Sequence, residues 1–291
     1  MQVEVIRPYG FCHGVKRATE IAFDLREKEK NRPIVILGQL VHNDKVAQAL
    51  KEKHIETILV DDEIENKLKQ YPLDTLVFFT AHGHLKKYDE MLDNLHLESI
   101  DAICPSVKLN NERIKNSLNT KKDIVYIGKS HHPETEAALD IDERIILFDV
   151  KTKEFIQRIK FPSYHQAIIF SQTTLSEKHY LDAIQMIKKK YRSIDIAPRA
   201  CFEMYRREEA VKNIDPLTEL IYIVGSKHSS NANELYQTAC EFHNGINVEM
   251  ISCKDDINRK TIENVSRVAI VSSASTPDKV IEDIQNYLES L

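Results

Sequence analysis

The chain of 291 residues lacks an excess of positive charge: 40 lysines and arginines stand against 45 aspartates and glutamates, which gives a net charge of −5. General binding to nucleic acid would show as a basic excess, so we expect no nucleic-acid partner. No apolar run reaches the length of a transmembrane helix, and the first residues, "MQVEVIRPYG", do not form a signal peptide. We therefore expect no membrane association and a cytoplasmic location.

Cysteine and glycine are also scarce, with five and seven residues. An odd number of cysteines without a signal peptide favours a reducing compartment, where a functional cysteine more often binds metal or does chemistry than forms a disulfide. The C-x₂-C signature of a local metal site is missing. Two of the few glycines, Gly10 and Gly14, nevertheless bracket Cys12 in "YGFCHGVKRA". Glycines at these places let the backbone turn sharply and approach a bulky group closely.

Three segments of the chain resemble one another. Each has a β-branched apolar run, a glycine, a polar loop and a helical pattern, and the glycines are Gly38, Gly128 and Gly225. A second apolar run follows in each segment and ends in small polar residues. These polar ends begin 42, 43 and 48 residues after the glycine and are Thr80-Ala81-His82, Ser171-Gln172-Thr173 and Ser273-Ala274-Ser275. A cysteine precedes each glycine by 26, 24 and 24 residues, namely Cys12, Cys104 and Cys201. The repeats indicate one structural unit used three times.

Apolar strands that alternate with helical patterns predict α/β modules with parallel sheets. We expect three such modules, related by a pseudo-threefold axis in a trefoil around a central site. Module 1 covers 1–103 and is completed by 279–291, module 2 covers 104–200 and module 3 covers 201–291. The last repeat has no cysteine after it, and the N-terminal strand supplies the missing one, so the two ends of the chain should meet within one module. No Pro/Gly/Ser-rich linker separates the modules, which should abut closely in a monomer.

The three cysteines at equivalent positions predict a metal centre. Three thiolates that meet at the ends of strands suit zinc or an iron–sulfur cluster. The alternative is that each cysteine packs as a small apolar side chain, which is the better interpretation for an isolated one. Cys240 and Cys253 have no repeat partners and are interpreted as core or incidental residues.

Hydrogen-bond donors gather at the other strand ends of the predicted modules. Imidazoles, hydroxyls and an amide placed before helices predict an anion site, most simply one for phosphate. The candidate ligands are His42, His82, His132, Thr173, Ser229, Ser230, Asn231 and Ser275. Glu134, in "HHPETE", is the nearby acid that could deliver a proton, although a carboxylate in the first turn of a helix is also favoured by the helix dipole alone.

The ordered motifs "GFCHGV", "VHN", "TAHG", "CPSV", "HPETE", "SQTTLS", "GSKHSSN" and "ASTPD" resemble those of the 4-hydroxy-3-methylbut-2-enyl diphosphate reductase family. The resemblance spans roughly Val3 to Asp278. It implies the last step of the methylerythritol phosphate route to isoprenoids, a two-electron, two-proton reductive dehydroxylation that yields isopentenyl and dimethylallyl diphosphates.

The resemblance also implies the parts of the site. Cys12, Cys104 and Cys201 match the ligands of a [4Fe–4S] cluster whose fourth iron is open to the substrate hydroxyl, and Glu134 matches the proton donor. The diphosphate ligands of the family match His42, His82, His132, Ser229, Asn231 and Ser275, and its other substrate-pocket positions match Thr173 and Ser230. Thr173 could also pass on the proton. Flavodoxin or ferredoxin is the implied electron donor.

The chain departs from the family pattern after Cys201, where Met204-Tyr205-Arg206-Arg207-Glu208 replaces Thr-Thr-Asn-Arg-Gln. His13 and Ser273 also stand where the family usually has alanine and glycine. These differences leave open a related iron–sulfur reductase of another substrate. A non-catalytic cluster protein, such as a redox or iron sensor, and a structural zinc site are further alternatives, and Glu134 discriminates against a sensor because a sensor needs no acid in the pocket.

Overall fold

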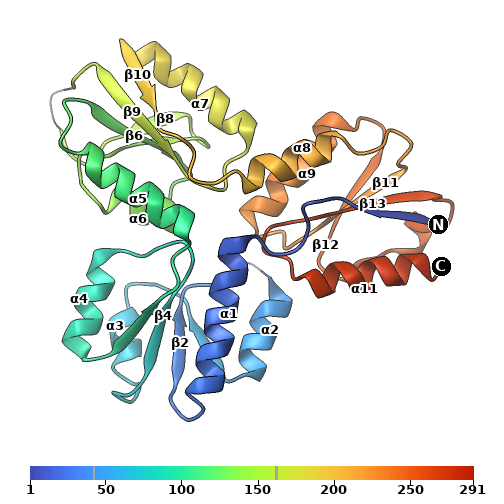
Figure 1. The fold of residues 1–291 in the computed structure, drawn as a ribbon, viewed down its shortest axis with the longest axis horizontal. Helices are drawn as coiled ribbons and strands as arrows, with labels where there is room; N and C mark the ends of the chain where they lie inside the picture. Colours follow the sequence, from blue (N-terminus) through green and yellow to red (C-terminus); the bar gives the residue numbers. More distant parts are fainter. Residues whose placement is uncertain (42, 161–162) are drawn as a thin grey trace. The chain divides into compact units, whose positions relative to one another are not determined.

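A computed structural model describes residues 1–41, 43–160 and 163–291. It contains three separate, mostly parallel β-sheets with flanking helices (Figure 1). The predicted α/β class is therefore confirmed. By its contacts the chain divides into two compact units, one made of 1–16, 41–50 and 203–291, the other of 17–40 and 51–202, so that the cuts fall within helices α1 and α2. Each unit is described by itself. No helix in the described ranges is both long and apolar enough to cross a bilayer.

The first sheet has the strand order β3-β2-β4-β5, and all its strands are parallel. The strands are β2 (Ile34–Leu37), β3 (Ile55–Ile58), β4 (Leu76–Phe79) and β5 (Glu98–Asp101). The chain around them forms α1 (His13–Lys28), α2 (Asp44–Glu52), α3 (Ile64–Leu68) and α4 (Lys86–Leu95). Strands β2 and β4 are buried along their whole length, as expected for central strands of a parallel sheet that is covered on both faces.

The second sheet has the order β10-β9-β6-β7-β8 and differs by one extra edge strand, β8, which runs antiparallel to β7. The strands are β6 (Asp123–Gly128), β7 (Ile146–Asp149), β8 (Glu154–Ile156), β9 (Gln166–Ser171) and β10 (Ser193–Ile196). The helices are α5 (Pro105–Ser117), α6 (Pro133–Leu139) and α7 (Glu177–Lys190). The first and second sheets belong to the same compact unit.

The third sheet, in the other unit, has the order β1-β13-β11-β12. Its strands are β1 (Gln2–Val5), β11 (Leu220–Val224), β12 (Asn247–Ile251) and β13 (Arg267–Ser272). Its helices are α8 (Glu203–Lys212), α9 (Ser230–Phe242), the 3₁₀ turn η1 (Lys254–Asp256), α10 (Arg259–Ile262) and α11 (Asp278–Glu289). Helix α11 buries Val280, Ile281, Ile284 and Leu288, a stripe of helical period, against this sheet.

The three sheets share one strand order. In each, the strand that ends in the loop glycine (β2, β6 or β11) lies beside the strand with the polar end (β4, β9 or β13), and the strand that leads to a cysteine (β5, β10 or β1) pairs with the latter. The repeat read from the sequence is thus present in three dimensions. The fourth position, filled by β3, β7 and β12, was not foreseen, and neither was β8.

The two ends of the chain meet in one module, as expected, but this module is the third and not the first. We expected residues 279–291 to complete module 1. Instead, Gln2–Val5 pairs in parallel with β13, and α11 packs against that same sheet (Figure 1). The N-terminal strand therefore supplies the cysteine strand of the third sheet. The physical reason is that β13 would have one unpaired edge without β1, and β5 and β10 fill the equivalent edges of β4 and β9 in the other two sheets.

Two of the loop glycines allow a helix to approach a strand end closely. A Cβ atom on Gly225 would lie 2.7 Å from the Cβ of Ala232, and one on Gly128 would lie 2.5 Å from Oγ1 of Thr135. In both cases the contacted residue is seven positions further along, in the helix that follows. Gly38 differs, since its φ of +79° rather than space requires glycine.

We expect Gly225→Ala to lower the free energy of unfolding by roughly 1–3 kcal/mol, because the added methyl group overpacks a fully buried contact. Chemical denaturation followed by circular dichroism measures this. Asn244→Ala, on an exposed turn, is the control and should change stability by less than about 0.5 kcal/mol. Equal stabilities of the Gly225→Ala variant and the parent protein would show that α9 can move away from β11 at little cost.

Candidate functional site

Each of the three repeat-equivalent cysteines lies between an edge strand and a helix. Cys12 immediately precedes α1, Cys104 is the N-cap residue of α5, and Cys201 is two residues before α8. All three side chains are half-buried, and none of the five cysteines, all of which the structure describes, forms a disulfide. The predicted position of a cysteine at the carboxyl end of a parallel strand is therefore observed in all three repeats.

The backbone of the neighbouring strand holds two of these cysteines in the same way. The amide of Cys12 donates a hydrogen bond to the carbonyl of Ala274 at 3.0 Å, and the amide of Cys104 donates to the carbonyl of Ala81 at 2.9 Å. Ala274 and Ala81 are the middle residues of equivalent polar strand ends. The repeat relation thus extends from the sheets to the hydrogen bonds that position the cysteine backbone.

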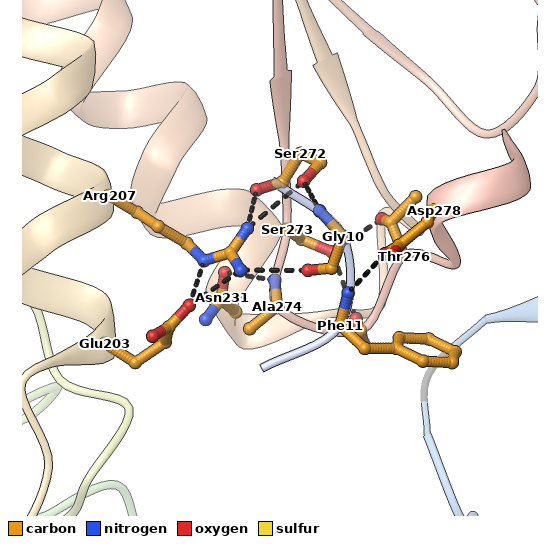
Figure 2. Close-up of polar contacts among 11 residues, drawn as sticks. Gly10, Phe11, Glu203, Arg207, Asn231, Ser272, Ser273, Ala274, Thr276 and Asp278 are labelled. Atoms are coloured by element: carbon orange, nitrogen blue, oxygen red, sulfur yellow. Dashed lines mark hydrogen bonds and ion pairs between the residues drawn. The ribbon is translucent and has the colours of Figure 1, made fainter. Parts of the chain in front are cut away.

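Side chains from the end of β13 and the start of α11 hold the loop before Cys12 (Figure 2). The amide of Gly10 donates to Oγ of Ser272 at 2.8 Å, and the amide of Phe11 donates to Oδ1 of Asp278 at 3.2 Å. Gly10 has a φ of +75°, and a Cβ there would lie 1.7 Å from Oδ1 of Asp278. A side chain at this position would be strained by the positive φ and would displace the carboxylate of Asp278, which explains the first of the two glycines that bracket Cys12. Sequence reasoning missed Ser272 and Asp278, although "ASTPD" was among the quoted motifs.

The predicted metal set is divided between the two compact units: Cys12 belongs to one, and Cys104 and Cys201 belong to the other. Among the residues that the structure describes, no three His, Cys, Asp or Glu side chains are arranged to hold a single metal ion. Shared ligation by the three cysteines stays a prediction that the structure leaves untested.

Two of the predicted anion ligands lie together in the second unit. The rings of His82, after β4, and His132, before α6, pack edge to face with centroids 5.6 Å apart. Nδ1 of His82 lies 3.3 Å from the hydroxyl of Thr80. His132 is the N-cap residue of α6, and its Nδ1 accepts the amide of Glu134 at 3.2 Å. In the neutral ring the proton is therefore on Nε2, which makes Nε2 a donor.

Glu134 is the acid at this end of the sheet, and it is 1% exposed. The amide of Thr173 donates to its Oε1 and the Thr173 hydroxyl to its Oε2, both at 2.8 Å, while the Tyr126 hydroxyl donates to Oε1 over 3.4 Å. Burial raises the pKa of Glu134 from 4.5 to about 7, and these hydrogen bonds only partly oppose the shift. The predicted pair of Glu134 and Thr173 is thus in direct contact, whereas Tyr126 was not foreseen.

Gln172 joins the ends of β6 and β9 beside this acid. Its Oε1 accepts the amide of Lys129 at 3.0 Å and the hydroxyl of Thr135 at 3.2 Å, and its Nε2 donates to Thr174 at 2.6 Å. These contacts fix the loop that carries Thr173. Gln172 is the middle residue of the polar end Ser171-Gln172-Thr173 that follows an apolar run, which is the sequence signal that could have identified it.

The third repeat places its polar residues at the start of α9. Ser229 is the N-cap residue, and its Oγ accepts the amide of Ala232 at 3.3 Å and lies 3.5 Å from Oγ of Ser275. Oδ1 of Asn231 accepts the amide of Ala274 at 3.2 Å, and Ser230 is the first residue of the helix. The predicted Ser229, Ser230, Asn231 and Ser275 are therefore grouped within one unit.

His42 lies outside the described residues. Its neighbour Asn43 caps α2, because Oδ1 of Asn43 accepts the amides of Lys45 at 3.0 Å and Val46 at 3.2 Å. All three glycine loops therefore lead to a capped helix N-terminus, at Asn43, His132 and Ser229. Such termini favour anions.

A family model described as "LytB protein" matches residues 3–289, nearly the whole chain. The chain belongs to the LytB protein family. A relative from Caldanaerobacter subterraneus subsp. tengcongensis is 32% identical over 293 residues, which cover 100% of this LytB chain and 98% of the relative. A relative from Bacillus subtilis is 31% identical over an alignment that covers 99% of this chain and 91% of the relative. Both carry the name 4-hydroxy-3-methylbut-2-enyl diphosphate reductase, so the resemblance found in the motifs is confirmed.

Solved structures agree. One is the E-1-hydroxy-2-methyl-but-2-enyl-4-diphosphate reductase from Plasmodium falciparum, which superposes with a TM-score of 0.82 at 26% identity. The superposition covers 100% of this LytB chain and 87% of the Plasmodium chain. A second structure, the terminal enzyme of the non-mevalonate pathway, has a TM-score of 0.69 at 24% identity, with both chains covered completely. The second comparison supports the fold alone.

The buried acid makes the stability of this LytB protein depend on pH. The folded carboxyl of Glu134 keeps its proton up to about pH 7, whereas in the unfolded chain it loses the proton near pH 4.5. Folding therefore binds a proton between these values, and the free energy of unfolding falls as pH rises through this window. Relative to Glu134→Gln, the parent protein should lose about 3 kcal/mol between pH 4.5 and pH 8.

Denaturant titrations of the metal-free protein at several pH values measure the difference. Glu136→Gln is the matched control, since Glu136 is in the same helical turn and is half-exposed. A parent-to-variant difference that stayed constant with pH would contradict the raised pKa.

Proposed function

We propose that this LytB-family chain is a 4-hydroxy-3-methylbut-2-enyl diphosphate reductase, which removes the allylic hydroxyl of its substrate with two electrons and two protons. The observation that carries the proposal is the buried Glu134, hydrogen-bonded to Thr173, in the same unit as the His82–His132 pair. A proton donor beside two imidazole donors suits a diphosphate that must lose a hydroxyl group as water.

The histidines would bind the diphosphate. Nε2 of His132 is a donor because Nδ1 is already committed to capping α6. His82 packs against that ring and adds a second imidazole. The capped start of α6 contributes its backbone dipole, which favours a negative charge near His132. Ser229, Ser230, Asn231 and Ser275 would supply the donors of the other unit, and His42 would add a further imidazole.

Glu134 would hold the proton. In its protonated form, Oε1 accepts hydrogen bonds from the Thr173 amide and the Tyr126 hydroxyl, so the proton resides on Oε2. Oε2 faces Oγ1 of Thr173 at 2.8 Å. The Thr173 hydroxyl can accept this proton and donate its own to the departing hydroxyl of the substrate. A pKa of about 7 keeps the acid partly protonated at neutral pH, as general acid catalysis requires.

Cys12, Cys104 and Cys201 would hold a [4Fe–4S] cluster. The donor set fits this group: three half-buried thiols, none in a disulfide, each at the start of a helix in an equivalent repeat. When bound, the cluster would supply the two electrons of the reaction, received from a flavodoxin or ferredoxin.

None of the departures after Cys201 replaces a proposed ligand of this site. Met204 is buried in the core of the third sheet, Tyr205 is exposed, and Arg207 coincides with the arginine of the family pattern. The substrate of the family is therefore preferred to a different one. A sensor is disfavoured, because it would have no use for Glu134, whose burial costs stability at neutral pH.

Cys104→Ser should abolish most of the iron-dependent absorbance of protein purified without oxygen, for which we expect about four irons per chain, or three if the open iron is lost. The measurements are iron content and the visible spectrum. Cys253 is half-buried, lies at the start of η1 and has no repeat partner. The Cys253→Ser variant is therefore the control and should keep its iron. Equal loss in the two variants would refute the equivalence of the three cysteines, and a colourless parent protein that contains zinc would replace the cluster by a zinc site.

Turnover tests the reaction itself. The parent protein should convert 4-hydroxy-3-methylbut-2-enyl diphosphate under anaerobic conditions with a strong reductant. Glu134→Gln keeps the shape of the side chain but cannot supply a proton, so its rate should fall about 10²–10⁴-fold with substrate affinity little changed. Glu136→Gln is the control, with nearly parental turnover. A parent protein that ignores this substrate sinks the proposed function, and a fully active Glu134→Gln removes the acid from its role.

A further inference from the structure

Arg207 is the largest of the fully buried side chains in the part of the chain that the structure describes, and neither the proposed reaction nor the proposed ligand set uses it. Its guanidinium donates to the carbonyl of Gly10 at 2.8 Å, and also to the carbonyl of Ser272 at 2.7 Å (Figure 2). Glu203 balances its charge at 2.7 Å. Arg207 thus joins helix α8, which follows Cys201, to the loop two residues before Cys12.

A second arginine repeats this arrangement one step along the chain. Arg17 lies in α1, the helix that follows Cys12, and donates from Nη1 to the carbonyl of Ile103 at 3.1 Å. Ile103 is the residue immediately before Cys104. Both residues belong to the same compact unit, and Arg17 is half-buried.

A third arginine completes the pattern. Arg113 lies in α5, the helix that follows Cys104, and donates from Nη1 to the carbonyl of Pro198 at 2.9 Å, three residues before Cys201. In the same loop, Arg199 pairs with Glu177 at 2.5 Å and lies over the ring of Tyr180 at 3.8 Å. The loop before Cys201 is therefore held from α5 as well as from α7.

The three contacts form a closed cycle. The helix after each cysteine carries an arginine that donates to a main-chain carbonyl just before the next cysteine, in the order Cys12 to Cys104, Cys104 to Cys201 and Cys201 to Cys12. A single arginine-to-carbonyl bond is common at loop ends, and Arg26 makes several of them far from any cysteine in the sequence. The cyclic order around three repeat-equivalent cysteines is what distinguishes these three.

We propose that Arg17, Arg113 and Arg207 are positioning residues that hold each cysteine loop in place from the helix of the preceding repeat. A guanidinium suits this task because its planar fork donates several hydrogen bonds at fixed angles, which the ammonium of lysine cannot reproduce. Loops held in this way are ordered before any cofactor binds, so the ordering costs less at the moment of binding. The inference rests on the proposed function only in taking the three cysteines as cofactor ligands.

The reactivity of the thiols tests this without cofactor or substrate. Metal-free, fully reduced protein is treated with iodoacetamide, and peptide mass spectrometry gives the alkylation rate of every cysteine. Arg17→Met should accelerate alkylation of Cys104, Arg113→Met that of Cys201, and Arg207→Met that of Cys12. We expect at least about a fivefold increase each, the factor for the loss of one hydrogen bond of about 1 kcal/mol. Cys240 and Cys253 should keep their rates in all three variants.

The direction of the change separates positioning from charge. Removal of a cation near a thiol raises the thiol pKa and slows alkylation, whereas release of a loop speeds it. A slower rate at the target cysteine would therefore overturn the proposal. So would an unchanged rate, an equal increase at all five cysteines, or an increase at the cysteine of the arginine's own helix instead of the next one.

Two controls match the variants. Arg26→Met removes a carbonyl-binding arginine from the same helix as Arg17, and Arg206→Met removes the exposed neighbour of Arg207. Neither should change the three rates. If Arg207→Met does not fold, Arg207→Lys replaces it, since it keeps the charge but cannot contact Gly10, Ser272 and Glu203 together, and it should still release Cys12.

The result is independent of the reductase assay. A protein without reductase activity could still show the cyclic pattern of rates, and an active enzyme could lack it. A second measurement, made on cluster-loaded protein, is the rate of iron release to a chelator, which should rise in the three arginine variants and not in the two controls.

Discussion

The whole arrangement depends on how a cysteine is attached to the end of a parallel sheet. In two repeats the cysteine amide donates to the carbonyl at the polar end of the neighbouring strand, at Ala81 or Ala274. In both cases the edge strand that leads to the cysteine, β1 or β5, runs parallel to this neighbour. In these two repeats the strand order therefore brings the cysteine backbone to the end of the neighbouring strand, just before the helix that follows.

The polar ends of the strands combine structural and chemical roles. His132 and Ser229 cap helices, and Oδ1 of Asn231 accepts the amide of Ala274, whose carbonyl accepts the amide of Cys12. Each of these side chains commits a polar atom to a hydrogen bond that stabilises the fold. Glu134 is the exception, because its burial opposes ionisation and lowers stability at neutral pH. A cost of this kind is typical of a group that serves function.

Much of this could be predicted from the sequence because the chain repeats itself. The apolar runs, the glycine loops and the cysteines recur at nearly constant spacing, so the α/β class, the strand ends and the grouping of Glu134 with Thr173 followed from local patterns and motif resemblance. The strands β3, β7 and β12 were missed because none of the recurring signals, the loop glycine, the polar end or the cysteine, marks them in the sequence. The pairing of β1 with β13 confirms that the N-terminal strand supplies the cysteine strand of the last repeat, whereas the assignment of residues 279–291 to module 1 was wrong, because repeat spacing does not show against which sheet the last helix packs.

The sequence by itself determined which residue types stand at the ends of the strands: three cysteines, a set of imidazoles and hydroxyls, and one acid, since motif order and repeat spacing are properties of the chain alone. The tertiary structure decided which of them touch. Only packing removes Glu134 from solvent and so raises its pKa, and only packing brings Arg207 to the carbonyl of Gly10, 197 residues away. The physical reason is that burial and long-range hydrogen bonds depend on distances in the folded state, which no local pattern encodes.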